Sequence, residues 1–140
     1  MTPDEIRARA RRITEELFNQ GDLAILDEVV DPSYVQYLAV EDRTTGVAEL
    51  AEFVTEIRRA FPDLRAHTEQ QVVEGDTLAQ RLTVTGTHSG AAFAGLPPAT
   101  GVRLRVNVVD IYRVGPAGRF TQRWTLWDEH AVRRQLGPAS

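Results

Sequence analysis

The sequence predicts an α+β domain in which helices cover one face of a curved, mainly antiparallel sheet. Up to Phe61 the apolar residues recur at helical spacing, and from Leu64 onward the apolar period changes to two. Turn residues then separate four strand-like segments. Helices that precede a run of antiparallel strands are typical of the α+β class. The 140 residues, 42% hydrophobic and 26% charged, predict a single domain over residues 1–140.

Three helices are expected in the first part of the chain. The segment Thr2–Glu5 predicts the first start, because it offers a threonine cap, a proline at the first position and a glutamate that completes a capping box. The apolar face of this helix is Ile6, Ala10, Ile13 and Leu17. A short second helix follows Asp22 and ends at Asp31-Pro32, and a third extends over Gly46–Phe61.

One short strand, Ser33–Leu38, is expected between the second and third helices. Four longer strands follow, near Leu64–Glu74, Thr77–His88, Val102–Val114 and Arg119–Glu129. Turn residues at Glu74–Asp76 and Gly115–Gly118 predict tight hairpins at two of the junctions. The segment Ser89–Gly101 is too long for a hairpin turn, and we expect it to cover part of the fold.

The composition excludes several kinds of chemistry. All 16 basic residues are arginine, and the chain has no lysine and no cysteine. A disulfide framework, a thiolate nucleophile, a cysteine-ligated zinc and a Schiff base are therefore excluded. The three histidines share no metal-ligand spacing and no glycine-rich phosphate loop follows a strand, so we expect no metal and no cofactor. Acid–base and electrostatic catalysis remain.

Charge and hydropathy limit the partners. With 20 acidic and 16 basic residues, the net charge of −4 lacks the basic footprint of a nucleic-acid binder. The charged segment Met1–Arg12 contains no apolar signal region, and no apolar run approaches the roughly 20 residues that span a bilayer. We expect a cytoplasmic protein that binds neither nucleic acid nor membranes.

Ionisable residues end the apolar faces of the last three strands. The even-numbered positions of these strands are mostly apolar and lead to His88, Asp110 and Asp128. Because the first and third strands of a meander run in the same direction, we expect His88 and Asp128 at one end of the inner face, about 10 Å apart. Asp110 is then expected toward the opposite end. A β-bulge would invert the alternation beyond it.

Each of these three residues allows a catalytic and a structural interpretation. Asp128 lies in the most aromatic stretch, with Trp124 and Trp127, where lost hydration is expected to raise the pKa of its carboxyl and make it a base near neutral pH. Structurally, Asp128 can mark the point where its strand reaches water. His88 can be a hydrogen-bonded histidine at a sheet end, and Asp110 can pair with an arginine on a neighbouring strand.

A series of motifs runs in order over nearly the whole chain. They are Asn19-Gln20-Gly21-Asp22-Leu23, Leu26-Asp27-Glu28, Ala60-Phe61-Pro62-Asp63-Leu64, Glu74-Gly75-Asp76, Gly86-Thr87-His88-Ser89-Gly90, Gly95-Leu96-Pro97-Pro98 with Thr100-Gly101, Ile111-Tyr112-Arg113, and Trp124 with Asp128 and Gln135-Leu136-Gly137. Together these motifs resemble the SnoaL-like polyketide cyclase family.

The resemblance implies the nuclear transport factor 2-like fold, in which helices pack on a strongly bent sheet to form a cone with an apolar pocket. Cyclases of this family close a ring of an aromatic polyketide precursor by intramolecular aldol condensation, without metal or organic cofactor. Their acid/base aspartate corresponds to Asp128, and the histidine of their Gly-Thr-His segment to His88. Many members carry histidine where this chain has Tyr37, which can donate a hydrogen bond but cannot act as an imidazole.

These observations lead to one catalytic hypothesis. Asp128 removes a proton from a carbon flanked by carbonyls of an aromatic or polyketone substrate, and the enolate attacks a second carbonyl. His88, with Tyr37 or Asn107, donates hydrogen bonds to the developing oxyanion. Asp110 is a further candidate for the site. The pocket walls are expected to include Phe18, Tyr34, Phe53, Phe93, Leu96 and Trp124.

Three alternatives remain open. The chain can act in polyketide hydroxylation, or it can open an epoxide with water activated by Asp128, Asp110 and an arginine. It can also be a non-catalytic carrier or assembly module for a small molecule. We further expect a homo-oligomer, a dimer or tetramer, formed through the outer sheet face. The polar positions on that face are Arg81, Thr83, Thr85, Arg103, Arg105 and Asn107.

Overall fold

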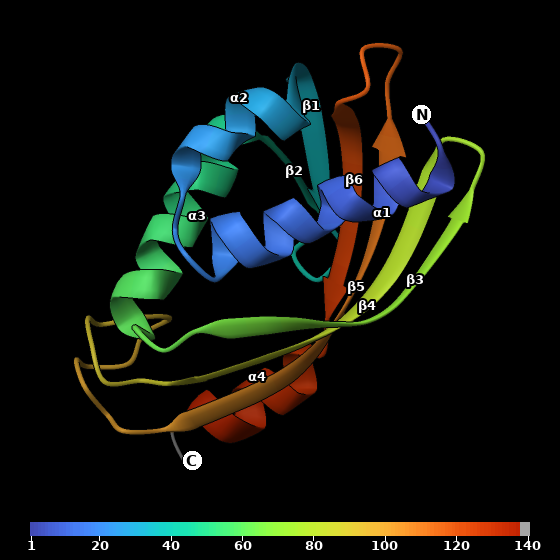
Figure 1. Ribbon diagram of the computed structural model, residues 1–140. Helices are drawn as coiled ribbons and strands as arrows, with labels where there is room; N and C mark the ends of the chain where they lie inside the picture. The colour runs from blue at the N-terminus through green and yellow to red at the C-terminus, as the bar shows by residue number, and fades with distance from the viewer. Residues whose placement is uncertain (138–140) are drawn as a thin grey trace.

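The computed structural model describes residues 1–137, so the last three residues of the predicted domain lie outside the described part. Within it, helices pack on one side of a strongly bent six-stranded sheet (Figure 1). The helices are α1 (Pro3–Arg12), α2 (Leu26–Val29), α3 (Val47–Ala60) and α4 (Glu129–Leu136), with the turns η1 (Ile13–Phe18) and η2 (Leu23–Ile25) between α1 and α2. The strands are β1 (Val30–Leu38), β2 (Arg43–Gly46), β3 (Arg65–Glu74), β4 (Thr77–Thr87), β5 (Arg103–Val114) and β6 (Phe120–Trp127).

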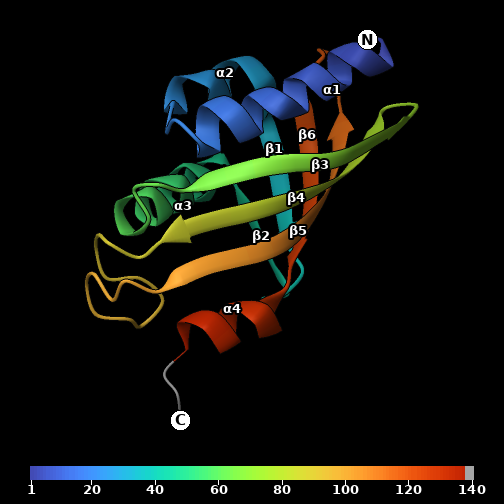
Figure 2. The same ribbon diagram turned by 60° about the horizontal axis from the view of Figure 1, so that its bottom comes forward.

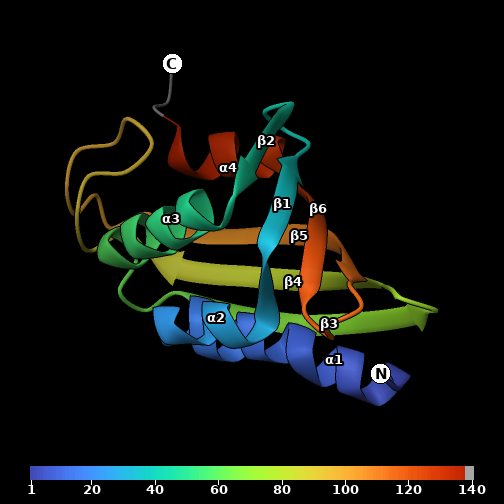
Figure 3. The same cartoon turned by 90° about the horizontal axis from the view of Figure 1, so that it is seen from above.

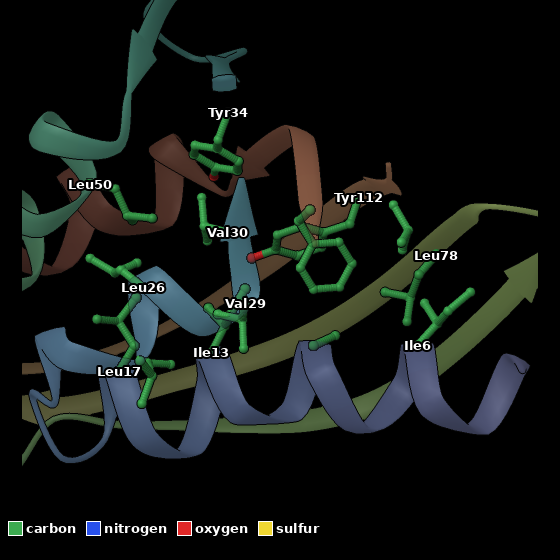
Figure 4. Packing of buried hydrophobic residues seen from close by; sticks show 14 of the residues in the cluster. Ile6, Ile13, Leu17, Leu26, Val29, Val30, Tyr34, Leu50, Leu78 and Tyr112 are labelled. Carbon is green, nitrogen blue, oxygen red and sulfur yellow. The ribbon is translucent and has the colours of Figure 1, made fainter. Parts of the chain in front are cut away.

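The first helix starts as the sequence predicts. The Glu5 amide donates to the Thr2 hydroxyl and the Thr2 amide donates to the Glu5 carboxylate, each over 3.1 Å. α1 continues into the π-helical turn η1, and its expected apolar face is at most 2% exposed. Figure 4 shows Ile6 and Ile13 of this face pointing toward the strands that carry Leu78 and Tyr112, while Leu17 lies beside Leu26 of α2. The N-terminal helix is therefore the main cover of the inner sheet face.

The strands are arranged in the order β2-β1-β6-β5-β4-β3. β3 to β6 form an antiparallel meander, while β1 pairs in parallel with β6. Figures 2 and 3 show how β3, β4 and β5 sweep away from β1 and β6, with α1 beside β3 on one side and α4 beside β5 on the other. This architecture confirms the predicted α+β class with a bent mixed sheet.

Two elements were not expected from the sequence. β2 is a four-residue edge strand that pairs with the end of β1. α4 begins at Asp128, whose carboxylate accepts a hydrogen bond from the Ala131 amide over 3.1 Å. Near its end, the Gln135 side chain accepts from the Arg105 amide and donates to the Arg105 carbonyl. Through Gln135, α4 thereby provides hydrogen-bond partners for the backbone of β5 at Arg105, where β6 no longer pairs with β5.

A β-bulge changes which side of β6 faces the helices. Val114 pairs with Phe120, but Arg113 pairs with Gln122, so Thr121 is an extra residue in β6. Phe120 points inward as predicted, whereas Trp124 and Leu126 lie on the outer face, 36% and 42% exposed. The expectation that Trp124 and Leu126 lie on the inner face is wrong, because the bulge inverts the alternation. Asp128 follows the end of β6 and caps α4, so it does not continue an apolar strand face.

The segment Ser89–Gly101 packs against the end of α3. The Gly90 and Ala91 amides donate to the carbonyls of Ala60 and Arg59 over 3.1 and 2.9 Å. Phe93 meets the Phe61 ring edge-on, with 5.7 Å between ring centroids. The loop is thus attached to the fold by backbone hydrogen bonds as well as by aromatic packing.

The described residues contain no helix that is both long enough and apolar enough to cross a membrane.

Replacement of Gly90 by alanine is expected to destabilise the protein. A Cβ atom at this position would lie 1.9 Å from the Arg59 carbonyl oxygen, so the loop or the end of α3 must move. We expect Gly90→Ala to lower the free energy of unfolding by about 1–3 kcal/mol, measured by urea unfolding. Gly46→Ala is the control, because its Cβ meets neighbours only at 3.7 Å or more. Equal stability of the two variants would contradict this packing.

Candidate functional site

A buried ion pair lies on the inner face where β5, β6 and β4 meet. Asp110 accepts hydrogen bonds from Arg123 over 3.1 Å (Nε) and from Gln80 over 3.1 Å. Arg123 also donates to Gln36 over 3.3 Å, and the Tyr34 hydroxyl donates to the same Gln36 oxygen over 2.7 Å. Asp110 is 1% exposed and the Arg123 side chain 10%. We call Tyr34, Gln36, Gln80, Asp110 and Arg123 the inner polar cluster.

The surroundings of the cluster keep Arg123 charged and the nearby phenols neutral. Burial works to lower the pKa of Arg123, but the interactions with Asp110, Tyr112 and Tyr34 together outweigh it and raise this pKa. Burial raises the pKa of Tyr34 to about 12 and raises that of Tyr112 well above its ordinary value. The rings of Phe18 and Tyr112 lie 5.9 and 5.8 Å from the guanidinium carbon. The cluster is therefore a fixed cationic and phenolic group between aromatic rings.

The position of Asp110 corrects one expectation in part and confirms another. It pairs in register with Gln80, near the end of β4 opposite to His88, so it lies far from His88 as predicted. It also pairs with Thr125, near the end of β6 that precedes Asp128, so its expected separation from Asp128 is wrong. Its pairing with an arginine of a neighbouring strand is confirmed by Arg123. Arg123 itself was missed, because the unbroken alternation favours Trp124 as the inward residue of β6.

Asp128 lies at the junction of β6 and α4. Its amide donates to the Asn107 carbonyl over 3.1 Å, and its carboxylate caps α4 through Oδ1. The residue is exposed, and the bulge turns the Trp124 indole to the outer face. The aromatic desolvation expected for the Asp128 carboxyl is therefore not found. The Trp127 indole remains on the inner side and donates to Glu129 over 2.6 Å.

His88 is fully buried and holds the loop Ser89–Gly101. Its Nε2 lies 2.6 Å from the Ala91 carbonyl oxygen, which can only accept, so this nitrogen carries a proton. Nδ1 lies 2.7 Å from the Thr100 hydroxyl, and the Phe61 ring centroid is 5.3 Å from that of the imidazole. Both ring nitrogens are thus occupied within the chain.

The sheet register separates His88 from Asp128. The His88 amide bonds to Val102, whereas the Asp128 amide bonds to Asn107, five residues further along β5. Five residues of a strand span about 17 Å. The expected distance of about 10 Å between the two side chains is therefore wrong, even though both residues follow strands that run in the same direction.

The other predicted site residues fall into separate groups. Tyr34 belongs to the inner polar cluster and Phe18 lies against its Arg123. Phe93 and Leu96 pack against a separate set of buried apolar residues that includes Phe61 and Leu104. Phe53 is 44% exposed on α3. Tyr37 and Asn107 occupy outward positions of β1 and β5, and Tyr37 donates to Asp42. The structure therefore does not bring the predicted residues to one enclosed place.

A half-buried apolar surface lies beside Asp128 on the inner face. It is formed by Val84, Val108, Trp127 and Val132, which pack against buried Leu104, Val106 and Leu136. Val108 and Trp127 are cross-strand partners, one residue before Asp128. We call these four half-buried side chains the inner apolar surface; together with Asp128 they are the best candidate for contact with an apolar substrate.

Two recesses are found elsewhere. One, of about 270 Å³, lies on the outer face between β1, β5 and β6 and includes Tyr37 and Trp124. The other, of about 300 Å³, lies beside α3 and includes Val54 and Arg58. Neither includes Asp128, His88 or Asp110, so the predicted apolar pocket is not one of these recesses. Within residues 1–137, no three histidine, aspartate or glutamate side chains are grouped to hold a metal ion.

The family profile and the similar solved structures point to the same protein family. The profile of the SnoaL-like polyketide cyclase family matches residues 8–136. No curated protein matches the chain. Among solved structures, IdmH from Streptomyces antibioticus, a candidate polyketide cyclase, is 28% identical, with 95% of this chain and 99% of that chain covered and a TM-score of 0.81.

Two further structures extend this comparison. AclR from Streptomyces galilaeus, a candidate hydroxylase, is 27% identical, with 97% of this chain and 83% of that chain covered and a TM-score of 0.84. A candidate SnoaL-like polyketide cyclase from Jannaschia sp. CCS1 is 21% identical, with 100% and 98% covered and a TM-score of 0.85. The fold is thus the predicted nuclear transport factor 2-like cone, built here as an open sheet and not as a closed barrel.

The raised pKa of Tyr34 makes stability fall at alkaline pH. In the unfolded chain the phenol ionises near its ordinary pKa of 10.0, whereas in the folded protein it ionises only near about 12. The unfolded state therefore loses its proton first, and the free energy of unfolding decreases as pH rises from 10 toward 12. The decrease from Tyr34 alone is about 2–3 kcal/mol.

Urea unfolding over this pH range measures the effect. Tyr34→Phe removes the phenol, so its stability is expected to decline less steeply with pH than that of the wild type. An identical decline in both proteins would show that Tyr34 titrates in the same way in the folded and unfolded states.

Proposed function

The chain belongs to the SnoaL-like polyketide cyclase family, and from this premise we propose that it cyclises or isomerises a polyketone substrate by enolate chemistry. The observation that carries the proposal is the place of Asp128. It is exposed at the end of β6, directly after Trp127 of the inner apolar surface. A substrate that covers this surface brings its reactive carbon to the carboxylate.

The hydrogen bonding of Asp128 suits proton transfer. The helix cap occupies Oδ1, which fixes the carboxylate at the N-terminus of α4. Within the described residues the cap leaves Oδ2 available to a substrate. Contact with an apolar substrate would displace water from an otherwise exposed carboxylate and strengthen it as a base in the complex. The base is then activated by binding and not by the resting fold.

The proposed reaction needs no change in oxidation state. Asp128 takes the proton from a carbon flanked by two carbonyls, and the electron pair of the C–H bond forms an enolate. The enolate carbon forms a new C–C bond to another carbonyl carbon of the same molecule, whose oxygen becomes an alkoxide. The protonated Asp128 then returns its proton to this oxygen. Substrate and product of this addition are isomers.

His88 acts indirectly in this proposal. Because its two ring nitrogens are held by Thr100 and Ala91, it positions the loop that carries Phe93 and Leu96 beside the inner apolar surface. The expected role of Tyr37 and Asn107 as donors to the oxyanion finds no support in their outward positions. The apolar surface and the loop would fold the substrate into a reactive conformer.

The inner polar cluster favours a second candidate function. Asp110 and Arg123, with Tyr34 beside them, combine a carboxylate, a cation and a phenol in a buried place. Such groups can activate water on an epoxide or take part in a hydroxylation, and AclR is described as a candidate hydroxylase. A non-catalytic carrier would need only the apolar surface. The homo-oligomer expected from the sequence belongs to the proposal as well.

Replacement of Asp128 by asparagine tests the proposed acid/base. Asparagine is also a good N-cap, so Asp128→Asn should fold normally but lower turnover by about 100-fold or more. Asp22→Asn is the matched control, because Asp22 is likewise an exposed aspartate that caps a helical turn, through Ala24. The assay uses an aromatic polyketone ester with an activated methylene and a ketone placed for ring closure. Wild-type turnover by Asp128→Asn would contradict the proposal.

The mass of the product separates the candidate functions. Aldol addition leaves the mass unchanged, or loses one water if dehydration follows. Epoxide opening adds one water, with labelled oxygen taken from the solvent, and hydroxylation adds one oxygen atom from molecular oxygen. Binding without any change of mass or structure, equal for wild type and Asp128→Asn, would identify a carrier.

A further inference from the structure

Two neighbouring carboxylates at the start of α4 have different hydrogen-bond partners. Asp128 uses its Oδ1 to accept from the Ala131 amide over 3.1 Å. Glu129 accepts from the Trp127 indole through Oε2 over 2.6 Å and from the Arg133 guanidinium through Oε1 over 3.0 Å. Both carboxylate oxygens of Glu129 are thus occupied within the chain, and one of them is bonded to the residue that precedes Asp128.

These contacts keep Glu129 ionised. The hydrogen bond from the Trp127 indole is the main cause that holds the pKa of Glu129 below its ordinary value, and Arg133 adds to it, while partial burial acts in the opposite direction. Glu129 also lies in the first turn of α4 with Arg133 four residues later, the order that a helix favours for such a pair. A carboxylate that is stabilised in its charged form is a weak base, so Glu129 is poorly suited to take a proton from carbon.

The hydrogen bond to Glu129 fixes the edge of the Trp127 indole. Trp127 pairs across the sheet with Val108 and is half-buried beside Val132 of α4. An indole has one polar hydrogen, on Nε1, and no acceptor. Because Glu129 accepts that hydrogen, the ring offers its apolar faces to whatever lies on the inner apolar surface.

We propose that Glu129 is a positioning residue that fixes the Trp127 indole as a rigid wall of the inner apolar surface beside Asp128. The inference rests on the proposed function, because it takes the inner apolar surface as the place that a substrate covers. A flat apolar ring of the substrate packs against the indole, and the carboxylate of Asp128 meets the substrate beside that ring. A wall held in one orientation lowers the entropy cost of binding and aligns the reacting carbon with the base.

The proposal divides the work between the two neighbouring carboxylates. Asp128 determines whether the proton is transferred, whereas Glu129 determines how tightly and in which orientation the substrate is held. Loss of Glu129 is therefore expected to act through Trp127 and to weaken binding. Arg133 contributes less, because its side chain is 79% exposed and its ion pair is accordingly weak.

Binding of 1,8-dihydroxyanthraquinone, a flat apolar tricycle, measures the role of Glu129. Equilibrium dialysis against this probe should show an affinity about tenfold lower for Glu129→Ala than for the wild type. Glu129→Gln should stay within about threefold of the wild type, because its amide oxygen can still accept from the indole. Glu16→Ala is the matched control: Glu16 is 32% exposed against 33% for Glu129, and each is paired with an arginine four residues away. This control should bind the probe like the wild type.

A double-mutant cycle shows whether Glu129 acts through Trp127. In a Trp127→Phe background the indole hydrogen is gone, so Glu129→Ala should cause no further loss of probe affinity. An equal tenfold loss in both backgrounds would overturn the proposal. If Glu129→Ala does not fold, Glu129→Leu replaces it in the cycle, because leucine is a good helix former and cannot accept a hydrogen bond.

Near-ultraviolet circular dichroism reports the orientation of the indole without any ligand. Trp124→Phe leaves Trp127 as the single tryptophan of the chain. In this background a fixed indole gives a distinct band, which Glu129→Ala should reduce, while Glu129→Gln and Glu16→Ala should retain it. A band and a probe affinity that are both unchanged in Glu129→Ala would overturn the proposal, as would a wild type that does not bind the probe.

Turnover of the aromatic polyketone ester separates this inference from the proposed reaction. Glu129→Ala should raise KM more than it lowers kcat, whereas Asp128→Asn should lower kcat. If Asp128→Asn turns over like the wild type while the probe and dichroism results hold, the proposed acid/base fails and the positioning of Trp127 stands. If Glu129→Gln abolishes turnover with probe affinity and dichroism unchanged, Glu129 is itself the base and the positioning role is overturned.

Discussion

The buried ion pair between Asp110 and Arg123 is the interaction on which the arrangement of the last strands depends. It can form only because Thr121 adds one residue to β6 and turns Arg123 inward. Without that bulge Asp110 would be a buried carboxylate without a cation, which is strongly unfavourable. The pair therefore stabilises the register of β6 against the one-residue shift that would expose Arg123 and bury Trp124.

The side chains on both faces of β6 are set by this register. On the inner side, Trp127 is part of the inner apolar surface and Asp128 is the N-cap of α4. On the outer side, Trp124 and Leu126 are exposed. One local irregularity thus sets which side chains of β6 face the helices and which lie on the outer face.

The sequence predicted what local periodicity and capping determine. The Thr2 cap, the apolar face of α1, the helix α3 and the alternation of β5 all depend on neighbours in the chain, and all are found. The role of His88 depends on contacts with the thirteen-residue loop Ser89–Gly101, which no sequence pattern predicts. α4 had recognisable signals, namely the Asp128 cap and Gly137 after its end, but the β pattern before it obscured them. The bulge could not be predicted from the sequence. The even-numbered positions of β6 are more apolar than the odd-numbered ones, and this pattern predicts an unbroken alternation.

A double-mutant cycle on the ion pair tests the orientation of β6 most directly. Asp110→Asn, Arg123→Gln and the double variant are compared with the wild type by urea unfolding. We expect a coupling energy of about 2–3 kcal/mol between the two side chains, because both are buried and in contact. Additive effects, with a coupling below about 0.5 kcal/mol, would mean that Arg123 does not face Asp110 and that Trp124 points inward.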